Sequence, residues 1–331
     1  MRVSESPLRD VLRLVVWYPV RWTVLALPPR AGLWLVRRLG DLHCLASRGK
    51  KRHLERCLDE LGLELSEADR RREVRAFFQT HYVNQLCIFI FPKLTRERLP
   101  EFLEFEGLER LLAVREAGRG AVVVLGHFGP AQAPLAGLGR LGFSVKQIGF
   151  PTDEGLSFIG RHVAFRLRLF YEGKIPAEIV RPGSDLRGVM RHLGAGGLVM
   201  TTGDGEGAGR RFGKYALFPF FGRQVYFPLG PARLAQKSGA LLFPMRLEPG
   251  TAAPFRAVIG QALNADGEAD PHVLTGRFLA EFSESVGARP GWWHFLERFH
   301  PGDLLRGPNR SLGRGPRGIV EEDASPSRFI V

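Results

Sequence analysis

Apolar residues recur at helical spacing along an early part of the chain, from Ala31 to Phe91. Ser66 and Asp69 stand at the spacing of a capping box, so a long helix is predicted to begin there. Toward its end this helix becomes wholly apolar, in the run "LCIFIF" (86–91). Such an end indicates either deep burial in the protein or contact with lipid tails, and the pattern does not separate the two.

Strand and helix patterns alternate in the rest of the chain, after a helix predicted within 105–120 that ends at glycine. Strands are predicted at 121–125, 143–149, 197–202, 240–246 and 255–261, and helices near 131–141, 184–194, 230–238 and 272–286. This alternation predicts an α/β fold with a central mixed, largely parallel sheet flanked by helices.

The N-terminal segment "VLRLVVWYPVRWTVLALPP" (11–29) is apolar, but arginines and a proline interrupt it before it reaches the roughly 18–20 residues that span a bilayer. Arg21 and the lack of an A-x-A site also argue against a signal peptide. Trp17, Tyr18 and Trp22 beside arginines suit either the headgroup layer of a membrane or a helix packed on the domain's own core. We predict three parts: a membrane-associating segment over 1–30, a main domain over 31–305 and a disordered tail over 306–331.

The composition is that of a basic globular protein. The chain has 331 residues, of which 44% are hydrophobic, and 47 Lys and Arg against 34 Asp and Glu give a net charge of +13. This charge favours polyanions, anionic lipid surfaces or acidic protein partners. No motif that interleaves basic and aromatic residues supports nucleic-acid binding. The three cysteines have no C-x-x-C spacing, so neither a zinc site nor a redox pair is expected.

The candidate chemistry lies at the end of a predicted strand, in "AVVVLGHFGPAQAP" (121–134). His127 stands where this strand gives way to a turn, and ligands of open α/β sheets bind beyond the carboxyl ends of strands. Pro130 suits the first position of the next helix, whose N-terminal partial charge would keep the imidazole neutral and able to act as a general base. Gly126 and Gly129 would let a substrate come close. The alternative is a histidine that fills the strand end and donates to a carbonyl.

Four blocks of sequence, in this order, resemble the acyltransferases related to the lipid A biosynthesis lauroyl and myristoyl transferases. They are "FEGLERLLAVREAGRGAVVVLGHFG" (105–129), "DLRGVMRHLGAGGLVMTTGDGEG" (185–207), "FPFFGRQVYFPLGPARLAQKSGALLFPM" (218–245) and "ARPGWWHFLERFH" (288–300). They are similar to the family's approach to its histidine, its acidic turn, its Phe-Phe-Gly element and its closing Trp-Trp signature. The resemblance implies a glycerolipid acyltransferase-like fold over 31–305 and no cofactor or metal.

The resemblance also implies a mechanism, in which a histidine deprotonates an acceptor hydroxyl that attacks an acyl thioester, while an acid five residues on orients the ring. His127 takes the position of the base, and Gln132 stands where the family has the acid. An amide can hold the ring's tautomer but cannot neutralise an imidazolium. Three interpretations stay open: a weak dyad with Gln132, a carboxylate supplied from elsewhere by Asp204 or Glu206, or a member that binds lipid without catalysis.

Other candidate residues follow from the same resemblance. Arg161 is similar to the family arginine that stabilises the developing oxyanion, although a charged helix face explains it equally well. Arg210 and Arg211 suit a phosphate on the acceptor or donor, with a solvated basic loop as the alternative. The substrate-contacting candidates are Phe128, Gly129, Arg210, Arg211 and Phe221. An apolar wall for the acyl chain is expected from Phe218, Phe220 and Phe221 or from the apolar helix end, with core packing as the alternative.

The implied partners are an acyl carrier protein or acyl-CoA as donor and a membrane lipid or glycolipid as acceptor. The implied location is the cytoplasmic face of the inner membrane, where the protein would bind an anionic surface in a peripheral or monotopic manner. A catalytically silent lipid-binding or scaffold protein of the same fold is the alternative function.

Overall fold

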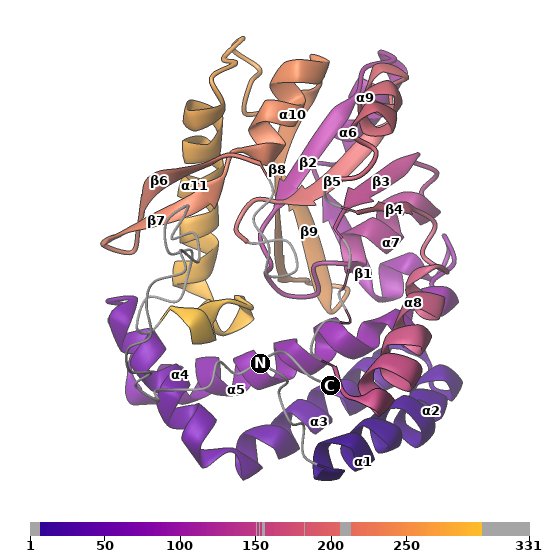
Figure 1. The fold of residues 1–331 in the computed structure, drawn as a ribbon, viewed down its shortest axis with the longest axis vertical. Helices are drawn as coiled ribbons and strands as arrows, with labels where there is room; N and C mark the ends of the chain where they lie inside the picture. The colour runs from indigo at the N-terminus through magenta and orange to yellow at the C-terminus, as the bar shows by residue number, and fades with distance from the viewer. Residues whose placement is uncertain are drawn as a thin grey trace, which may run out of the picture.

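A central sheet organises the molecule (Figure 1). The computed structural model describes residues 7–149, 151, 153, 156–181, 183–205 and 213–299. The strands of the sheet are β1 (Leu103–Glu106), β2 (Ala121–Leu125), β3 (Val145–Ile148), β4 (Glu178–Val180), β5 (Leu198–Thr202), β8 (Leu241–Pro249) and β9 (Phe255–Ile259). Their order is β1-β9-β8-β2-β5-β3-β4, and every neighbouring pair is parallel except the antiparallel β8 and β9. The predicted mixed, largely parallel sheet is therefore confirmed.

The strand that leads to His127 lies in the middle of this sheet. β2 pairs with β8 on one side and with β5 on the other, and every one of its residues is buried. A strand covered on both faces must be apolar throughout, which explains the unbroken run "AVVVL". Because β2 and β5 are parallel neighbours in register, the turns that follow them open at the same edge of the sheet.

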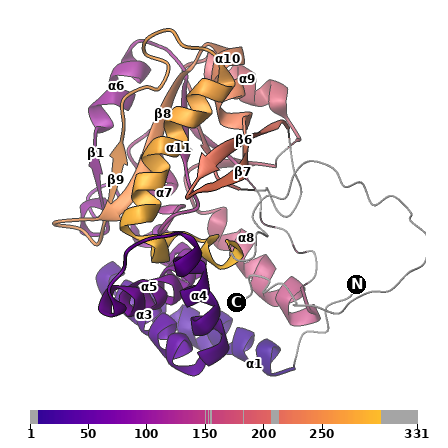
Figure 2. The same ribbon diagram turned by 90° about the vertical axis from the view of Figure 1, so that its left-hand side faces the viewer.

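Helices cover the sheet and form a separate layer at its carboxyl edge. The flanking helices are α6 (Leu108–Glu116), α7 (Ala133–Arg140), α8 (Arg166–Glu172), α9 (Leu186–Gly194), α10 (Gly230–Ser238) and α11 (Pro271–Ala288), with the π-helical turn η5 (Gly160–Phe165) before α8. The layer consists of α1 (Pro7–Val15), η1 (Val16–Val20), α2 (Arg21–Ala26), α3 (Pro29–Ala46), α4 (Arg48–Glu60) and α5 (Glu67–Leu86). Both Figure 1 and Figure 2 show α3, α4 and α5 below the sheet.

The N-terminal segment packs on the protein itself through one part of its surface. Trp17, which the sequence allowed in a headgroup layer, is only 1% exposed and meets the Phe89 ring edge to face at 5.4 Å between centroids. Arg13 of α1 donates a hydrogen bond to Asp10 of the same helix and another to Ser157, which precedes η5. The second bond connects α1 to η5. Burial of Trp17 corrects the headgroup assignment for that residue, because the chain supplies its own apolar partner. In the described part of the chain, no helix has the length and apolarity needed to cross a membrane.

The apolar end of α5 is buried in protein. Ser66 caps the helix as predicted, since its hydroxyl accepts a hydrogen bond from the Asp69 amide at 3.1 Å. The helix ends at Leu86 and continues as short 3-10 turns, and every side chain of the run 86–91 is buried. The two alternatives for this run are thereby resolved in favour of deep burial.

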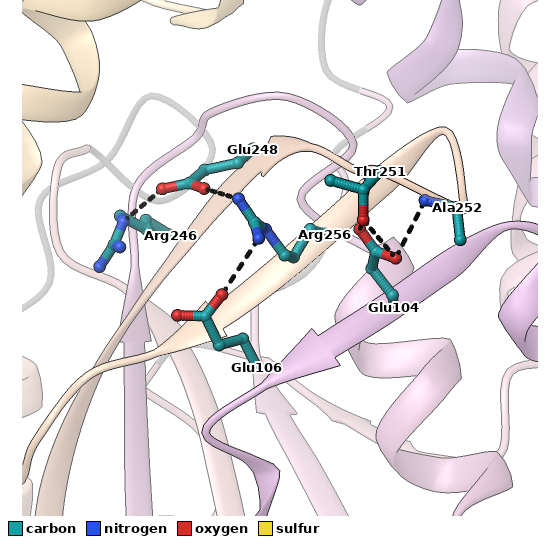
Figure 3. A network of polar contacts seen from close by, with 7 residues as sticks. All are labelled: Glu104, Glu106, Arg246, Glu248, Thr251, Ala252 and Arg256. Atoms are coloured by element: carbon teal, nitrogen blue, oxygen red, sulfur yellow. Dashed lines mark hydrogen bonds and ion pairs between the residues drawn. The ribbon is translucent and has the colours of Figure 1, made fainter.

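A polar network ties the edge strand β1 to the hairpin of β8 and β9 (Figure 3). The Glu248 carboxylate accepts from Arg246 at 2.7 Å and from Arg256 at 2.9 Å, and Arg256 also pairs with Glu106 of β1 at 3.2 Å. Glu104 accepts from the backbone amide of Thr251 at 2.6 Å, and this bond lowers the pKa of Glu104. These contacts hold strand β1, whose last two residues the sequence pattern places at the start of a helix.

Candidate active site

The site is centred on a histidine and an aspartate that come from neighbouring strands. His127 follows β2, Asp204 follows β5, and the Nδ1 of His127 lies 2.7 Å from Oδ1 of Asp204. The second carboxylate oxygen, Oδ2, accepts the backbone N–H of His127 at 2.9 Å. Two bonds to one residue fix both the position and the ring plane of the imidazole.

Asp204 is fully buried, and a third donor accompanies it. The indole Nε1–H of Trp293 donates to Oδ2 at 3.1 Å. A buried carboxylate needs such donors, because removal of its water is otherwise strongly unfavourable. The turn that carries Asp204 can lie close to the Phe295 and His127 rings because residue 205 is glycine. A Cβ there would lie 2.6 Å from the Phe295 ring and 3.1 Å from the His127 ring.

The arrangement defines which nitrogen of His127 can act. An ionised carboxylate only accepts hydrogen bonds, so Nδ1 carries the proton toward Asp204 and Nε2 keeps its lone pair. The His127 side chain is 32% exposed, and no described residue hydrogen-bonds to Nε2. The ring packs on Phe295, with 4.8 Å between centroids, and on His294, with 6.1 Å between centroids. A basic nitrogen is therefore presented to an incoming proton donor.

A second histidine supports the turn from behind. The backbone N–H of His294 donates to the His127 carbonyl at 2.9 Å, and its ring Nε2 lies 2.9 Å from the Gly129 carbonyl. Asn84 of α5 contacts the same ring. Burial, together with the nearby His127, lowers the pKa of His294 to about 4. His294 is therefore neutral near neutral pH, and it joins the helical layer to the turn that carries His127.

Gln132 does not contact His127; its partner is another carboxylate. Its Nε2 donates to Oε1 of Glu172 at 3.0 Å, and Arg168 donates to the same oxygen at 2.8 Å. Glu172 is 1% exposed. The amide thus supplies a proton donor to a buried carboxylate, which an acid at this position could not do while ionised.

The glycines and the proline of the turn have other roles than the sequence indicated. A Cβ at Gly126 would lie 2.0 Å from the Phe282 ring, and one at Gly129 would lie 2.9 Å from the Trp292 ring. Both glycines therefore make room for the protein's own aromatic side chains, which corrects the expectation that they admit substrate. The helix α7 begins at Ala133, after Gln132, so Pro130 lies in the preceding turn and not at the first helical position.

The other described candidates have partners of their own. Arg161 is exposed and forms an ion pair with Asp153 at 3.3 Å. Phe128 is buried, with its ring against Phe282 and Trp292. Glu206, Arg210, Arg211 and the tail 306–331 are outside the residues that the structure describes.

The expected acyl wall is mostly core. Phe218 and Phe220 are buried in the hairpin of β6 (Tyr215–Phe220) and β7 (Arg223–Pro228), and Phe220 packs against Phe282 and Trp293. Phe221 forms the hairpin turn with a positive φ of 46° and contacts Phe220 and Phe299. These contacts match the core-packing alternative.

The sequence did not identify Trp293 and Glu172 as parts of the site. Trp293 stands out in the sequence only as part of the closing Trp-Trp signature, although an indole N–H can serve a buried acceptor. Glu172 gave no signal, because it lies on a helix far along the chain from Gln132. Across the described ranges, no group of three or more His, Cys, Asp or Glu side chains could hold a metal ion.

The site is a partly exposed imidazole hydrogen-bonded to a buried carboxylate, at the carboxyl edge of the mostly parallel sheet of an α/β protein. A family model described as bacterial lipid A biosynthesis acyltransferase matches residues 6–300, and the chain belongs to that family. No curated protein shows a significant match to the chain. Membership identifies the general activity as acyl transfer in lipid biosynthesis, with an acyl donor and a lipid acceptor.

Proposed function

We propose that the protein transfers a fatty acyl chain from a thioester to a hydroxyl or amine of a membrane lipid or glycolipid, with His127 as general base and Asp204 as its acid partner. The observation that carries the proposal is the 2.7 Å contact between Nδ1 of His127 and Asp204, made by a ring that stays 32% exposed. Geometry of this kind orients the base and stabilises the imidazolium that forms.

The chemistry follows from that pair. Nε2 of His127 takes the proton of the acceptor hydroxyl, and the oxygen attacks the thioester carbonyl. The tetrahedral intermediate collapses, the C–S bond breaks, and the imidazolium returns the proton to the leaving thiolate. Asp204 remains ionised throughout and offsets the positive charge of the ring, which Gln132 could not do.

The proposed donor and acceptor rest on the net charge of the protein and on the family to which it belongs. An acyl carrier protein is acidic and coenzyme A carries several phosphates, so a chain with a net charge of +13 suits either donor. Arg161 is the proposed donor of hydrogen bonds to the developing oxyanion. To reach the substrate, its side chain would have to leave its exposed ion pair with Asp153.

The helical layer supports a proposed membrane contact at the cytoplasmic face of the inner membrane. Its exposed large apolar side chains are Val11, Leu12, Val15, Trp22, Trp34, Leu42 and Leu45. Arg21 lies over the Trp22 ring and Arg38 over the Trp34 ring, at 5.5 and 5.4 Å from the centroids. Aromatic rings paired with cations suit the headgroup layer, where both find partners.

A transfer assay tests the proposal. Purified protein is incubated with radiolabelled acyl thioester and total membrane lipid, and labelled lipid is extracted. Wild type should produce labelled lipid and His127→Ala should lose about 10³-fold or more of that rate. His272→Ala, which removes an exposed histidine at the start of α11, is the matched control and should keep the wild-type rate. Equal rates for wild type and His127→Ala would contradict the proposal and favour the silent lipid-binding alternative.

A further inference from the structure

A cavity of about 330 Å³ lies between the helical layer and the turn that follows His127. Gly129 and Pro130 of that turn form part of its wall, and α3 and α5 contribute most of the rest. No lining residue is acidic. Four of the lining residues are arginines: Arg37, Arg72, Arg75 and Arg289. The cavity is thus strongly basic and shares its wall with the candidate active site.

Two of these arginines are already neutralised. Arg75 pairs with Asp41 through two hydrogen bonds of 2.7 and 2.8 Å, and Arg72 pairs with Asp69 at 2.7 Å. The first pairing is strong enough to lower the pKa of Asp41 to about 2. These two arginines are also largely exposed, so they form the rim of the cavity.

The other two arginines have no carboxylate partner among the described residues. Arg37 lies over the Phe255 ring at 5.2 Å, and Arg289 lies over the Trp292 ring at 5.8 Å. Burial lowers the pKa of Arg37, which reflects a half-buried guanidinium without a counter-charge. The half-buried Arg37 cation is unfavourable in this place unless an anion joins it, whereas Arg289 is exposed to solvent. The cavity therefore presents two guanidinium groups without a carboxylate partner among the described residues, one of which is partly desolvated.

The shape of the lining limits what the anion can be. The Arg37 and Arg289 guanidinium groups lie over the Phe255 and Trp292 rings, and the wall also includes apolar Ala76 and Val83 and polar Gln79 and Thr80. Planar guanidinium forks match the oxygens of a phosphate, and the apolar part of the wall accommodates the carbon skeleton attached to it. A phosphate ester fits both features better than a free inorganic ion or a carboxylate side chain does.

We propose that this cavity binds a phosphate group of one of the two substrates, held chiefly by Arg37 and Arg289. The inference rests on the proposed acyl transfer, since the phosphate belongs either to the headgroup of the acceptor lipid or to the pantetheine arm of the donor. Binding here positions the substrate beside the turn that carries His127.

Calorimetric titration of the full chain with inorganic phosphate tests the site without any need for turnover. Wild type should bind phosphate saturably, and Arg37→Gln combined with Arg289→Gln should weaken binding by about tenfold or more. Arg52→Gln combined with Arg71→Gln removes the same charge from exposed positions on α4 and α5 and should leave binding unchanged. Equal binding by the cavity variant and wild type would overturn the proposal.

A variant with the opposite effect guards against misfolding as an explanation. Asp41→Asn releases Arg75 from its carboxylate and adds a positive charge at the rim, so phosphate should bind several-fold more tightly. Unchanged or weaker binding by a folded Asp41→Asn protein would count against the site.

Competition identifies the source of the phosphate. Displacement of bound phosphate by phosphopantetheine, and not by pantetheine, would assign the cavity to the donor. Displacement by glycerol phosphate, and not by glycerol, would assign it to the lipid headgroup. If neither compound competes, the substrate assignment is wrong. If the protein binds phosphate in this cavity but shows no acyl transfer, the proposed function is wrong and the phosphate site stands.

Discussion

Replacement of Gln132 by glutamate introduces the acid that the sequence resemblance led us to expect at this position, and the structure predicts that it harms the protein. In the wild type, Nε2 of Gln132 donates to Glu172 at 3.0 Å, and Glu172 is buried. Gln132→Glu removes that donor and adds a second carboxylate. Loss of a hydrogen bond to a buried charged group costs about 1.5–3 kcal/mol.

Repulsion adds a pH dependence to this loss. Two full charges about 3 Å apart repel by about 5 kcal/mol at an effective dielectric constant of about 20, so the pair binds a proton instead of ionising fully. The folded variant therefore has a carboxyl pKa above its unfolded value and binds more protons than the unfolded chain. Its stability falls as pH rises above about 4. We expect Gln132→Glu to be destabilised by more than about 3 kcal/mol at pH 8, where the repulsion adds to the lost hydrogen bond, and by less at pH 5.

Urea unfolding of wild type and Gln132→Glu at both pH values measures this difference. Gln224→Glu, the same change at an exposed position of β7, is the matched control and should shift the free energy of unfolding by less than about 0.5 kcal/mol. The acyl-transfer rate of Gln132→Glu should not exceed that of wild type, because residue 132 does not contact His127. A stable variant with a raised transfer rate would refute this reasoning and restore Gln132 as the partner of the base.

Three further predictions concern other parts of the structure. Trp293→Phe removes the indole donor to Asp204 and should lower kcat by about tenfold or more while circular dichroism stays unchanged; an unchanged kcat would show that the bond is dispensable. Gly126→Ala places a methyl group against the packed Phe282 ring and should lower the free energy of unfolding by about 1–3 kcal/mol in urea titrations, and a neutral result would contradict the packing role. A hydrogen bond from the half-exposed Arg75 is the main cause that lowers the pKa of Asp41 to about 2. The ionised Asp41 should therefore contribute about 1 kcal/mol to the free energy of unfolding above pH 4 and lose this contribution toward pH 2. Acid titration of wild type and Asp41→Asn should show the difference between their free energies of unfolding shrinking over that pH range.

The sequence predicted the central strands well because each is a run of apolar residues bounded by glycine or polar residues. β2, β5, β8 and β9 all lie within or close to their predicted ranges, and α10 matches its range. β1 and β4 were missed since both are short edge strands with a single buried residue each. Their pairing depends on distant partners such as the β8–β9 hairpin, which local patterns do not contain.

The candidate site was predictable only in part for the same reason. His127 stands at a strand end that the local pattern identifies, and the parallel sheet gave Asp204 as one possible partner. Whether His127 pairs with Asp204 or with Gln132 depends on the directions in which the side chains point in the turns after β2 and β5, and the local sequence does not contain them. The Gln132 contact with Glu172 and the Trp293 contact with Asp204 join residues far apart in the chain, so no spacing rule predicts them.

The most direct test of the account compares the acyl-transfer rates of Asp204→Asn and wild type at saturating thioester. Asparagine keeps the size of the side chain but presents an amide to His127 and cannot offset an imidazolium, so the rate should fall by about 10⁴-fold. Asp270→Asn, an exposed change at the start of α11, serves as the control and should retain the wild-type rate. An Asp204→Asn protein within tenfold of wild type would contradict the assignment of His127 and Asp204 as the catalytic pair.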